Sequence, residues 1–315
     1  MLQRPSRKEQ VGAIGRRDPC RALTLTGMRG GTEQLQRLAI VNADDFGLSL
    51  GVNRGIIEAH RRGIVTTASL LANGAALDDA IRQIRTHPDL GVGIHLCLVE
   101  GAPVLAPKSV PSLVGTDGGF LPSLRALLFR VVAGRIAGPE VEAEWRAQIE
   151  LLLDRGVAIQ KADSHMHLHV LPPFFERFLR LCREYRIEAV RLPLEPVTPT
   201  SFTRPSGLGL GLLASAQASK ISKHGLRAPD HFRGASVSGG LTTARLVRYL
   251  RTLPVGVTEI MTHPGLPGPP LPGWAASARY DRAAELATLV SPAVRAALGT
   301  SGIELTTFAA LRSAS

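Results

Sequence analysis

Short apolar runs that are typical of buried strands alternate with longer amphipathic segments that are typical of helices between residues 38 and 265. The expected strands are 38–43, 65–72, 90–99, 159–170, 188–193 and 257–265. The expected helices are 51–63, 77–88, 139–157, 172–187 and 241–254. Prolines begin the fourth of these helices, and Gly156 lies near the end of the third. The repeated strand and helix order predicts an α/β fold with a parallel sheet and outer helices, either open or closed into a barrel.

The length of 315 residues and the hydrophobic content of 44% suffice for a sizeable core. Because no low-complexity linker and no second core pattern interrupt the alternation, we expect a single domain over residues 38–315. Residues 1–37 show no sustained apolar periodicity and lack the apolar run of a secretory signal. We therefore expect a disordered extension, or a start codon assigned too early with Met28 as the true start, in preference to an Arg-rich transit peptide.

The net charge of +11 is concentrated in two parts of the chain. Residues 1–38 carry eight basic and three acidic side chains, residues 201–251 carry eight and one, and the rest carries 21 and 22. The remaining body is thus nearly neutral, aromatic residues make up only 4% of the chain, and basic and aromatic residues do not interleave. This distribution argues against a protein dedicated to nucleic-acid binding.

The three cysteines, Cys20, Cys97 and Cys182, are far apart and form no CxxC spacing. Neither a disulfide framework nor a thiolate metal site is therefore expected, and a reducing, cytoplasmic location fits best. No apolar stretch reaches the roughly 20 residues of a membrane-spanning helix, so we expect a soluble or peripheral protein.

Polar residues whose side chains can take part in catalysis or metal binding follow the expected strand ends. In parallel α/β folds the carboxyl ends of the strands share one face, and in barrels this face carries the active site. The residues at these positions are Asp44, Asp45, His95, Asp163, His165, His167, His169, Arg191 and His263. Their convergence predicts a functional site at that face.

Asp44 and Asp45 are adjacent like charges at the end of a strand that reads as buried. One interpretation is a solvated turn in which an aspartate caps the backbone. If the pair is buried instead, its mutual repulsion requires a positively charged neighbour.

The histidines of the run HMHLH are the most specific local feature of the chain. In an extended strand His165, His167 and His169 project from one face, where burial without partners is costly. Imidazole is the commonest nitrogen ligand of divalent metals. A metal site does not need all three histidines, and one of them can instead form hydrogen bonds alone. For the isolated histidines we expect structural hydrogen bonds to backbone carbonyls, namely for His60, His87 and His224.

One aspartate and two histidines form an oxygen and nitrogen ligand set with open positions for water and substrate, which suits Lewis-acid hydrolysis. The second aspartate of the pair is then available as a general base for the water. A bound cation would also explain why two carboxylates are tolerated side by side. Mg²⁺, Zn²⁺, Mn²⁺ and Co²⁺ all accept such mixed ligands, so the identity of the metal stays open.

The motifs NADDFGLSLGVNRGI, VGIHLCL, DSHMHLH, VRLP and EIMTHPG together resemble the YdjC-like carbohydrate deacetylases over residues 38–315. More narrowly, LCLVEGAPVL, APDHFRG, SGGLT and the YDRAAELATLVSPAVRAAL that follows THPG look like the hopanoid-biosynthesis-associated branch. The resemblance implies an incomplete (β/α) barrel, which is TIM-like and related to the polysaccharide deacetylases.

The resemblance also implies roles for individual residues. Asp44 matches the catalytic base, Asp45, His95 and His165 match the metal ligands, and His263 matches the group that protonates the leaving amine. The further candidates for contact with the substrate or with other site residues are His167, His169 and Arg191. Two roles are open for Arg191. It can orient a carboxylate or the substrate, or it can form a structural salt bridge.

The function that the resemblance implies is metal-dependent removal of the N-acetyl group from an N-acetylglucosamine-containing substrate. We expect a lipid-linked hopanoid glycoside, with soluble chitooligosaccharides as the alternative. Rivals from other classes are a metal-free sugar-binding barrel and a phosphodiesterase. The sequence leaves the number of subunits open and is compatible with an oligomer.

The segment Gly207–Gly234 places an apolar run beside several basic residues. It fits a helix packed on the barrel with a solvated basic face. It also fits a lid that meets a lipid-linked sugar at an anionic membrane surface, which would make the protein peripheral to the inner face of that membrane.

Overall fold

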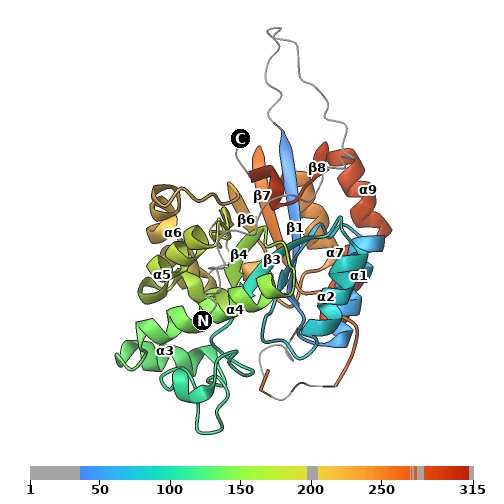
Figure 1. Ribbon diagram of the computed structural model, residues 1–315. Helices are drawn as coiled ribbons and strands as arrows, with labels where there is room; N and C mark the ends of the chain where they lie inside the picture. The colour runs from blue at the N-terminus through green and yellow to red at the C-terminus, as the bar shows by residue number, and fades with distance from the viewer. Residues whose placement is uncertain (1–35, 197–204, 270, 272, 275–279, 312–315) are drawn as a thin grey trace, which may run out of the picture. The chain divides into compact units, whose positions relative to one another are not determined.

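The computed structural model describes residues 36–196, 205–269, 271, 273–274 and 280–311 (Figure 1). Every described element belongs to one compact unit, residues 35–315. The prediction for residues 1–37 lies almost wholly outside the described residues and stays a prediction.

The described strands are β1 (Arg37–Phe46), β2 (Thr67–Leu70), β3 (Gly91–Leu96), β4 (Lys161–Ser164), β5 (Ala189–Val190), β6 (His231–Arg233), β7 (Gly256–Thr262) and β8 (Ile303–Leu305). The described α-helices are α1 (Leu50–Arg62), α2 (Leu77–Thr86), α3 (Leu124–Val132), α4 (Gly138–Asp154), α5 (Pro172–Glu184), α6 (Pro205–Lys223), α7 (Thr243–Thr252), α8 (Arg282–Leu289) and α9 (Pro292–Ser301). Short 3₁₀ helices include η2 (His165–Val170) and η4 (Ala235–Val237).

The described strands form a parallel sheet in the order β5-β4-β3-β2-β1-β7-β6. The strand β8 pairs with the beginning of β1, which makes β1 the central strand. Because β5 and β6 stand at the two ends of this order, the sheet is an open half-barrel (Figure 1). The predicted α/β fold with an incomplete barrel of parallel strands is confirmed.

The helices form where an apolar stripe meets a capping residue. In α1 the hydroxyl of Ser49 accepts a hydrogen bond from the backbone N–H of Val52 at 3.1 Å, and the buried face of the helix packs on the sheet. Farther along the core, Trp145 of α4 lies edge-on to Phe174 and Phe178 of α5, with ring centroids 6.0 and 6.2 Å apart. These rings join the two helices, which follow each other along the outer side of the sheet.

The strand that was expected over residues 159–170 ends at Ser164, so this prediction is wrong for the histidine run. Met166 and His167 have left-handed backbone conformations, with φ of 53° and 56°, and the run forms the 3₁₀ helix η2. His165, His167 and His169 consequently do not share one strand face. Pairing of β4 with β3 stops at Ser164, the residue before His165. No local sequence pattern encodes this end of the pairing.

The isolated histidines bind backbone carbonyls as expected. The Nδ1 atoms of His60, His87 and His224 lie 2.9 Å from the carbonyl oxygens of Val65, Gln83 and Lys220 respectively. Cys97 and Cys182 are buried free thiols. Within the described part of the chain, no helix combines the length and the apolar character needed to cross a membrane.

Helix α1 and the loop after β7 approach each other at their glycines. The N–H of Leu266 donates to the carbonyl of Gly51 at 2.9 Å, and a Cβ on Gly55 would collide with the backbone of Gly265. This loop begins at His263, so the close approach helps to place a candidate catalytic side chain.

We expect Gly55→Ala to destabilise the protein by about 1–3 kcal/mol, because the added methyl group has no space against Gly265. Gly299→Ala is the matched control, since this helical glycine of α9 has no heavy atom within 4 Å of its Cβ position. The control should gain about 0.5–1 kcal/mol of stability from helix propensity. Denaturant unfolding measures both, and equal stability of the two variants would contradict the packing argument.

Candidate metal and catalytic site

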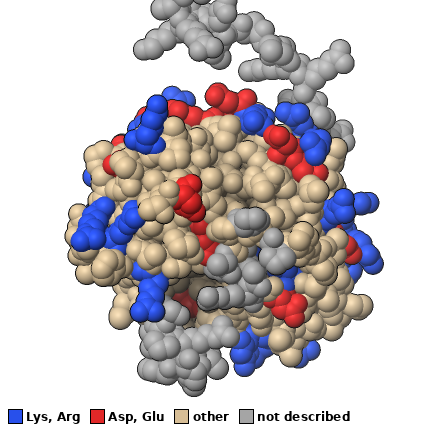
Figure 2. Space-filling view, turned by 90° about the horizontal axis from the view of Figure 1, so that it is seen from below, with Lys and Arg blue, Asp and Glu red and all other residues tan. Residues whose placement is uncertain are grey.

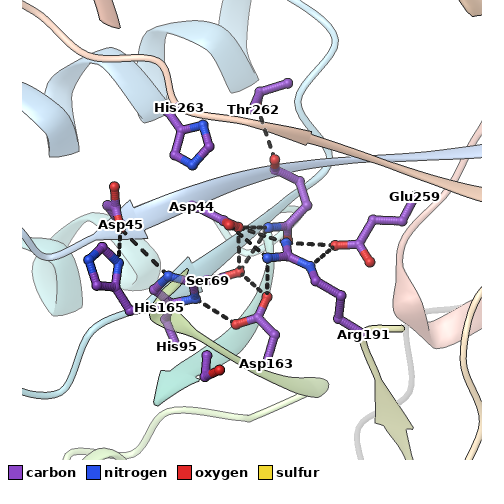
Figure 3. Close-up of polar contacts among 12 residues, drawn as sticks. Asp44, Asp45, Ser69, His95, Asp163, His165, Arg191, Glu259, Thr262 and His263 are labelled. Atoms are coloured by element: carbon purple, nitrogen blue, oxygen red, sulfur yellow. Dashed lines mark hydrogen bonds and ion pairs between the residues drawn. The ribbon is translucent and has the colours of Figure 1, made fainter. Parts of the chain in front are cut away.

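The two adjacent aspartates lie at an irregular end of β1. Pairing with β2 shifts register between Ala43 and Phe46, and Asp45 has a left-handed φ of 66°. In a regular strand successive side chains point to opposite faces. Here both carboxylates reach the same buried cluster, as Figure 3 shows, so the irregularity lets neighbours in sequence serve one site.

Each aspartate has its own arginine. Both carboxylate oxygens of Asp44 accept hydrogen bonds from Arg191 at 2.7 Å, and Oδ2 of Asp45 accepts one from Arg282 at 2.5 Å. Asp44 and Asp45 are only 2% and 1% exposed, so the interpretation as a solvated turn is wrong. The positive neighbours that a buried pair requires are present.

Asp44 is held in the charged form. Burial raises its pKa, but the charge and hydrogen bonds of Arg191 outweigh this effect and bring the pKa below its ordinary value. Its Oδ1 also accepts hydrogen bonds from Asn42 at 2.7 Å and from Ser69 at 3.1 Å. Among the described residues, Oδ2 accepts a hydrogen bond from Arg191 alone, so this oxygen retains acceptor capacity for a water molecule.

Asp45, His95 and His165 converge from three different segments of the chain. The Oδ1 atom of Asp45 lies 3.6 Å from Nε2 of His95 and 3.2 Å from Nδ1 of His165. All three side chains are buried. Since the carboxylate of Asp163 accepts the Nδ1–H of His95 at 2.6 Å, the Nε2 lone pair of His95 is left for another partner.

This group fits a divalent metal ion. One carboxylate oxygen and two imidazole nitrogens lie within 4.8 Å of one another. Arg282 pairs with Oδ2 of Asp45 and leaves Oδ1 toward the histidines. A second group of ligand type, Asp44 with His95 and Asp163, suits a cation less well, because its carboxylates are already paired with buried cations.

His165 sits between two carboxylates. Burial lowers its pKa, but Asp45 and Glu100 outweigh this effect and raise the pKa to about 9. Imidazole binds a metal only in the unprotonated form, so a bound ion would replace a proton at this position.

A network of buried charges lies beneath the two aspartates. Arg191 also donates to Glu259 at 2.8 Å and lies 3.0 Å from a carboxylate oxygen of Asp163, which in turn pairs with Lys161. Arg191 therefore orients the carboxylate of Asp44 and forms structural ion pairs as well. The sequence left open whether Arg191 orients a carboxylate or forms a structural salt bridge, and its contacts fit both roles.

His263 lies above the aspartates, as Figure 3 shows. Its backbone N–H donates to Oε2 of Glu285 at 2.6 Å, and its ring packs against Tyr280 with centroids 4.4 Å apart. Burial lowers the pKa of the imidazole and so favours its neutral form. The carboxylate of Glu285, 4.0 Å from Nδ1, offers a charge that would favour the ring when it takes up a proton.

The other two histidines of the run differ in their surroundings. His169 accepts a hydrogen bond from the hydroxyl of Ser164 at 2.7 Å and donates to the carbonyl of Arg191 at 3.1 Å. Both of its ring nitrogens are thus engaged with the protein. His167 lines the same cavity as Asp44 and stays a candidate for substrate contact.

A cavity of about 450 Å³ opens onto these residues. Its polar end contains Asp44, His95, His165 and His263. Its apolar wall comes from α3, η2 and α6 through Leu124, Leu128, Leu168, Leu210 and Leu213. Figure 2 is viewed toward the carboxyl ends of the parallel strands and shows a hollow in the surface there.

Residues 38–300 match the family model of the YdjC-like proteins. The chain belongs to the YdjC-like family. Its relatives include proteins named carbohydrate deacetylase from several organisms. The one from Geobacillus stearothermophilus is 35% identical over 87% of this chain and 98% of its own length, and the one from Homo sapiens is 36% identical over 84% and 88%.

A solved structure from Enterococcus faecalis, named for a proposed role in cellobiose-phosphate cleavage, superposes on this YdjC-like chain with a TM-score of 0.69. It is 27% identical, and the match covers 88% of this chain and all of the other. The resemblance to the YdjC-like family that the motifs indicated is confirmed.

Several site residues of this family member were not recognised from the sequence. Lys161 pairs with Asp163, Glu259 with Arg191, and Arg282 with Asp45. Glu285 accepts the backbone N–H of His263. For Lys161 and Glu259 the usable signal was an ionisable residue inside a strand that is otherwise buried. Arg282 and Glu285 lie on α8, far along the chain, and no local pattern marks them.

We expect Asp45→Asn, His95→Ala and His165→Ala to bind Zn²⁺ more weakly by over about 100-fold, since even the partners of metal ligands are typically worth 10–100-fold. Asp44→Asn should keep the wild-type affinity, because Asp44 already pairs with Arg191. Calorimetric titration of the metal-free variants measures this. If Asp44→Asn lost the ion and Asp45→Asn kept it, the roles of the two aspartates would be reversed.

Proposed function

We propose that this protein is a metal-dependent carbohydrate N-deacetylase that acts on an N-acetylated amino sugar. The observation that carries the proposal is the placement of Asp44, His95 and His165 at the polar end of one cavity, with Asp45 within ligand distance of the two histidines. The carbohydrate deacetylase names of the relatives support the reaction class.

A divalent ion bound by Asp45, His95 and His165 would supply Lewis acidity for the amide carbonyl and the attacking water. Asp44 accepts the proton of that water through Oδ2, the oxygen with remaining acceptor capacity. Arg191 holds this carboxylate in place through two hydrogen bonds, and its charge stabilises the anionic form of Asp44. His263 lines the same cavity. After its imidazole has taken up a proton from water, which the carboxylate of Glu285 favours, it can deliver that proton to the leaving amine.

The apolar wall of the cavity supports a more specific substrate, an N-acetylglucosaminyl glycolipid of the hopanoid type. Leu210 and Leu213 of α6 face the same cavity as Asp44, and Leu124 and Leu128 of α3 complete the wall. A soluble oligosaccharide offers hydroxyl groups that such a wall cannot pair, whereas an apolar aglycone would bury surface against it.

Contact with an anionic membrane is part of this proposal. The same two helices expose large apolar side chains, with Leu212 of α6 75% exposed and Phe129 and Val132 of α3 66% and 88% exposed. Arg125 and Arg135 are exposed near them in the sequence. Apolar side chains flanked by basic groups favour the interface of an anionic bilayer.

The segment Gly207–Gly234 combines features of both interpretations of its sequence. As a helix on the barrel, α6 packs on α5 and Lys220 pairs with Glu176 at 2.9 Å. As a wall of the cavity, it presents Leu210 and Leu213 to the site. The side chain of Leu208 lies outside the described residues.

We expect Asp44→Asn to lower acetate release from N-acetylated sugars by about 10²–10⁴-fold while metal binding is kept, because an amide cannot accept the water proton. Asp89→Asn, the same change at an exposed aspartate, is the control and should retain activity. Acetate assays on both variants and on the wild type measure this. Phosphate-ester cleavage without acetate release by the wild type would favour a phosphodiesterase, and sugar binding without either reaction would favour a binding protein.

We expect the double variant Leu210→Ser and Leu213→Ser to lose acetate release from a glycosyl hopanoid in anionic vesicles by at least about tenfold, since two buried leucine contacts are worth more than 1.4 kcal/mol. Release from soluble chitobiose should change much less. Leu153→Ser, at an exposed leucine of α4, is the control for the substitution.

Equal losses on the two substrates would mean that Leu210 and Leu213 serve only the core. Higher wild-type activity on chitobiose than on the glycolipid would contradict the hopanoid assignment and leave the deacetylase chemistry in place.

A further inference from the structure

In the group that fits a metal ion, His95 and His165 have the same arrangement of neighbours. Each turns one ring nitrogen toward Oδ1 of Asp45, through Nε2 of His95 at 3.6 Å and Nδ1 of His165 at 3.2 Å. Each turns its other nitrogen toward a buried carboxylate. For His95 this is Asp163 at 2.6 Å, and for His165 it is Oε2 of Glu100 at 3.8 Å.

Glu100 occupies its position in a conformation that glutamate rarely adopts. Its φ of 63° is left-handed, and its side chain is 1% exposed. The N–H of Glu100 donates to the carbonyl of Leu121, and that of Gly101 donates to Gly273, both at 2.9 Å. Glycine adopts this backbone without strain, so a glutamate here raises the free energy of the fold, a cost that a role for its carboxylate would offset.

The loop that carries Glu100 is supported by a different carboxylate. Glu144 of α4 accepts hydrogen bonds from the N–H groups of Val104 and Leu105 at 2.8 and 3.0 Å. This second buried carboxylate therefore holds the same loop without contacting either histidine.

We propose that Glu100 is the positioning residue of His165, whose carboxylate receives the Nε2–H and thereby directs the Nδ1 lone pair toward Asp45 and the metal ion. The proposal rests on the metal-dependent function proposed above. A carboxylate that accepts the distal N–H of a ligating histidine fixes the tautomer and the orientation of the ring, and its loss typically weakens metal binding by about 10–100-fold. Asp163 has the corresponding place behind His95.

The test measures metal binding without substrate, by calorimetric titration of metal-free protein with Zn²⁺ and by the visible spectrum of the Co²⁺ form. Glu100→Gln should weaken Zn²⁺ binding about 10–100-fold and alter the Co²⁺ spectrum. Glu100→Gly should weaken it equally, yet unfold at the same or a higher denaturant concentration than the wild type, because glycine relieves the left-handed backbone. Glu144→Gln should bind Zn²⁺ with the wild-type affinity.

Each contrary result has its own meaning. Unchanged Zn²⁺ affinity in Glu100→Gln and Glu100→Gly would overturn the positioning role and leave the proposed function intact. A loss as large as that of His165→Ala would overturn it too, since Glu100 would then be a ligand itself. If Glu144→Gln weakened binding as much as Glu100→Gln, support of the loop would replace positioning. A wild-type protein that binds no divalent ion would overturn both proposals.

Discussion

The guanidinium group of Arg191 is the interaction on which the site depends. It lies directly after β5, is fully buried, and contacts Asp44 on β1, Asp163 on β4 and Glu259 on β7. One planar cation with five donors thus connects strands from the edge to the centre of the sheet. Removing such a partner would leave buried carboxylates without compensation, which is far more costly than the net gain from forming the pairs.

This network explains how two adjacent aspartates acquire different tasks. Asp44 is fixed by Arg191 and keeps one oxygen with spare acceptor capacity. Asp45 gives Oδ2 to Arg282, so its Oδ1 is left toward His95 and His165. The left-handed backbone at Asp45 lets both carboxylates reach the same site, so the backbone strain is located where the function needs it.

The sheet supplies the polar end of the cavity, whereas segments inserted between strands and helices supply the rest. The connection from β3 to α4 contributes α3, and the connection from β5 to β6 contributes α6. A rigid group of charged side chains is thereby combined with an apolar wall whose residues do not take part in the chemistry. Substrate preference can change through that wall without disturbing the buried ion pairs.

The sequence by itself determined the alternation of strands and helices, because apolar periodicity and end signals are local. It also located Asp44, Asp45 and His95 at strand ends, where parallel strands bring polar residues to one face. Only the tertiary structure decided that the histidine run leaves the strand and forms η2, and that Arg282 and Glu100 lie around the group of Asp45, His95 and His165. Those contacts join residues far apart in the chain, and their energy comes from burial and charge pairing, which no local pattern contains.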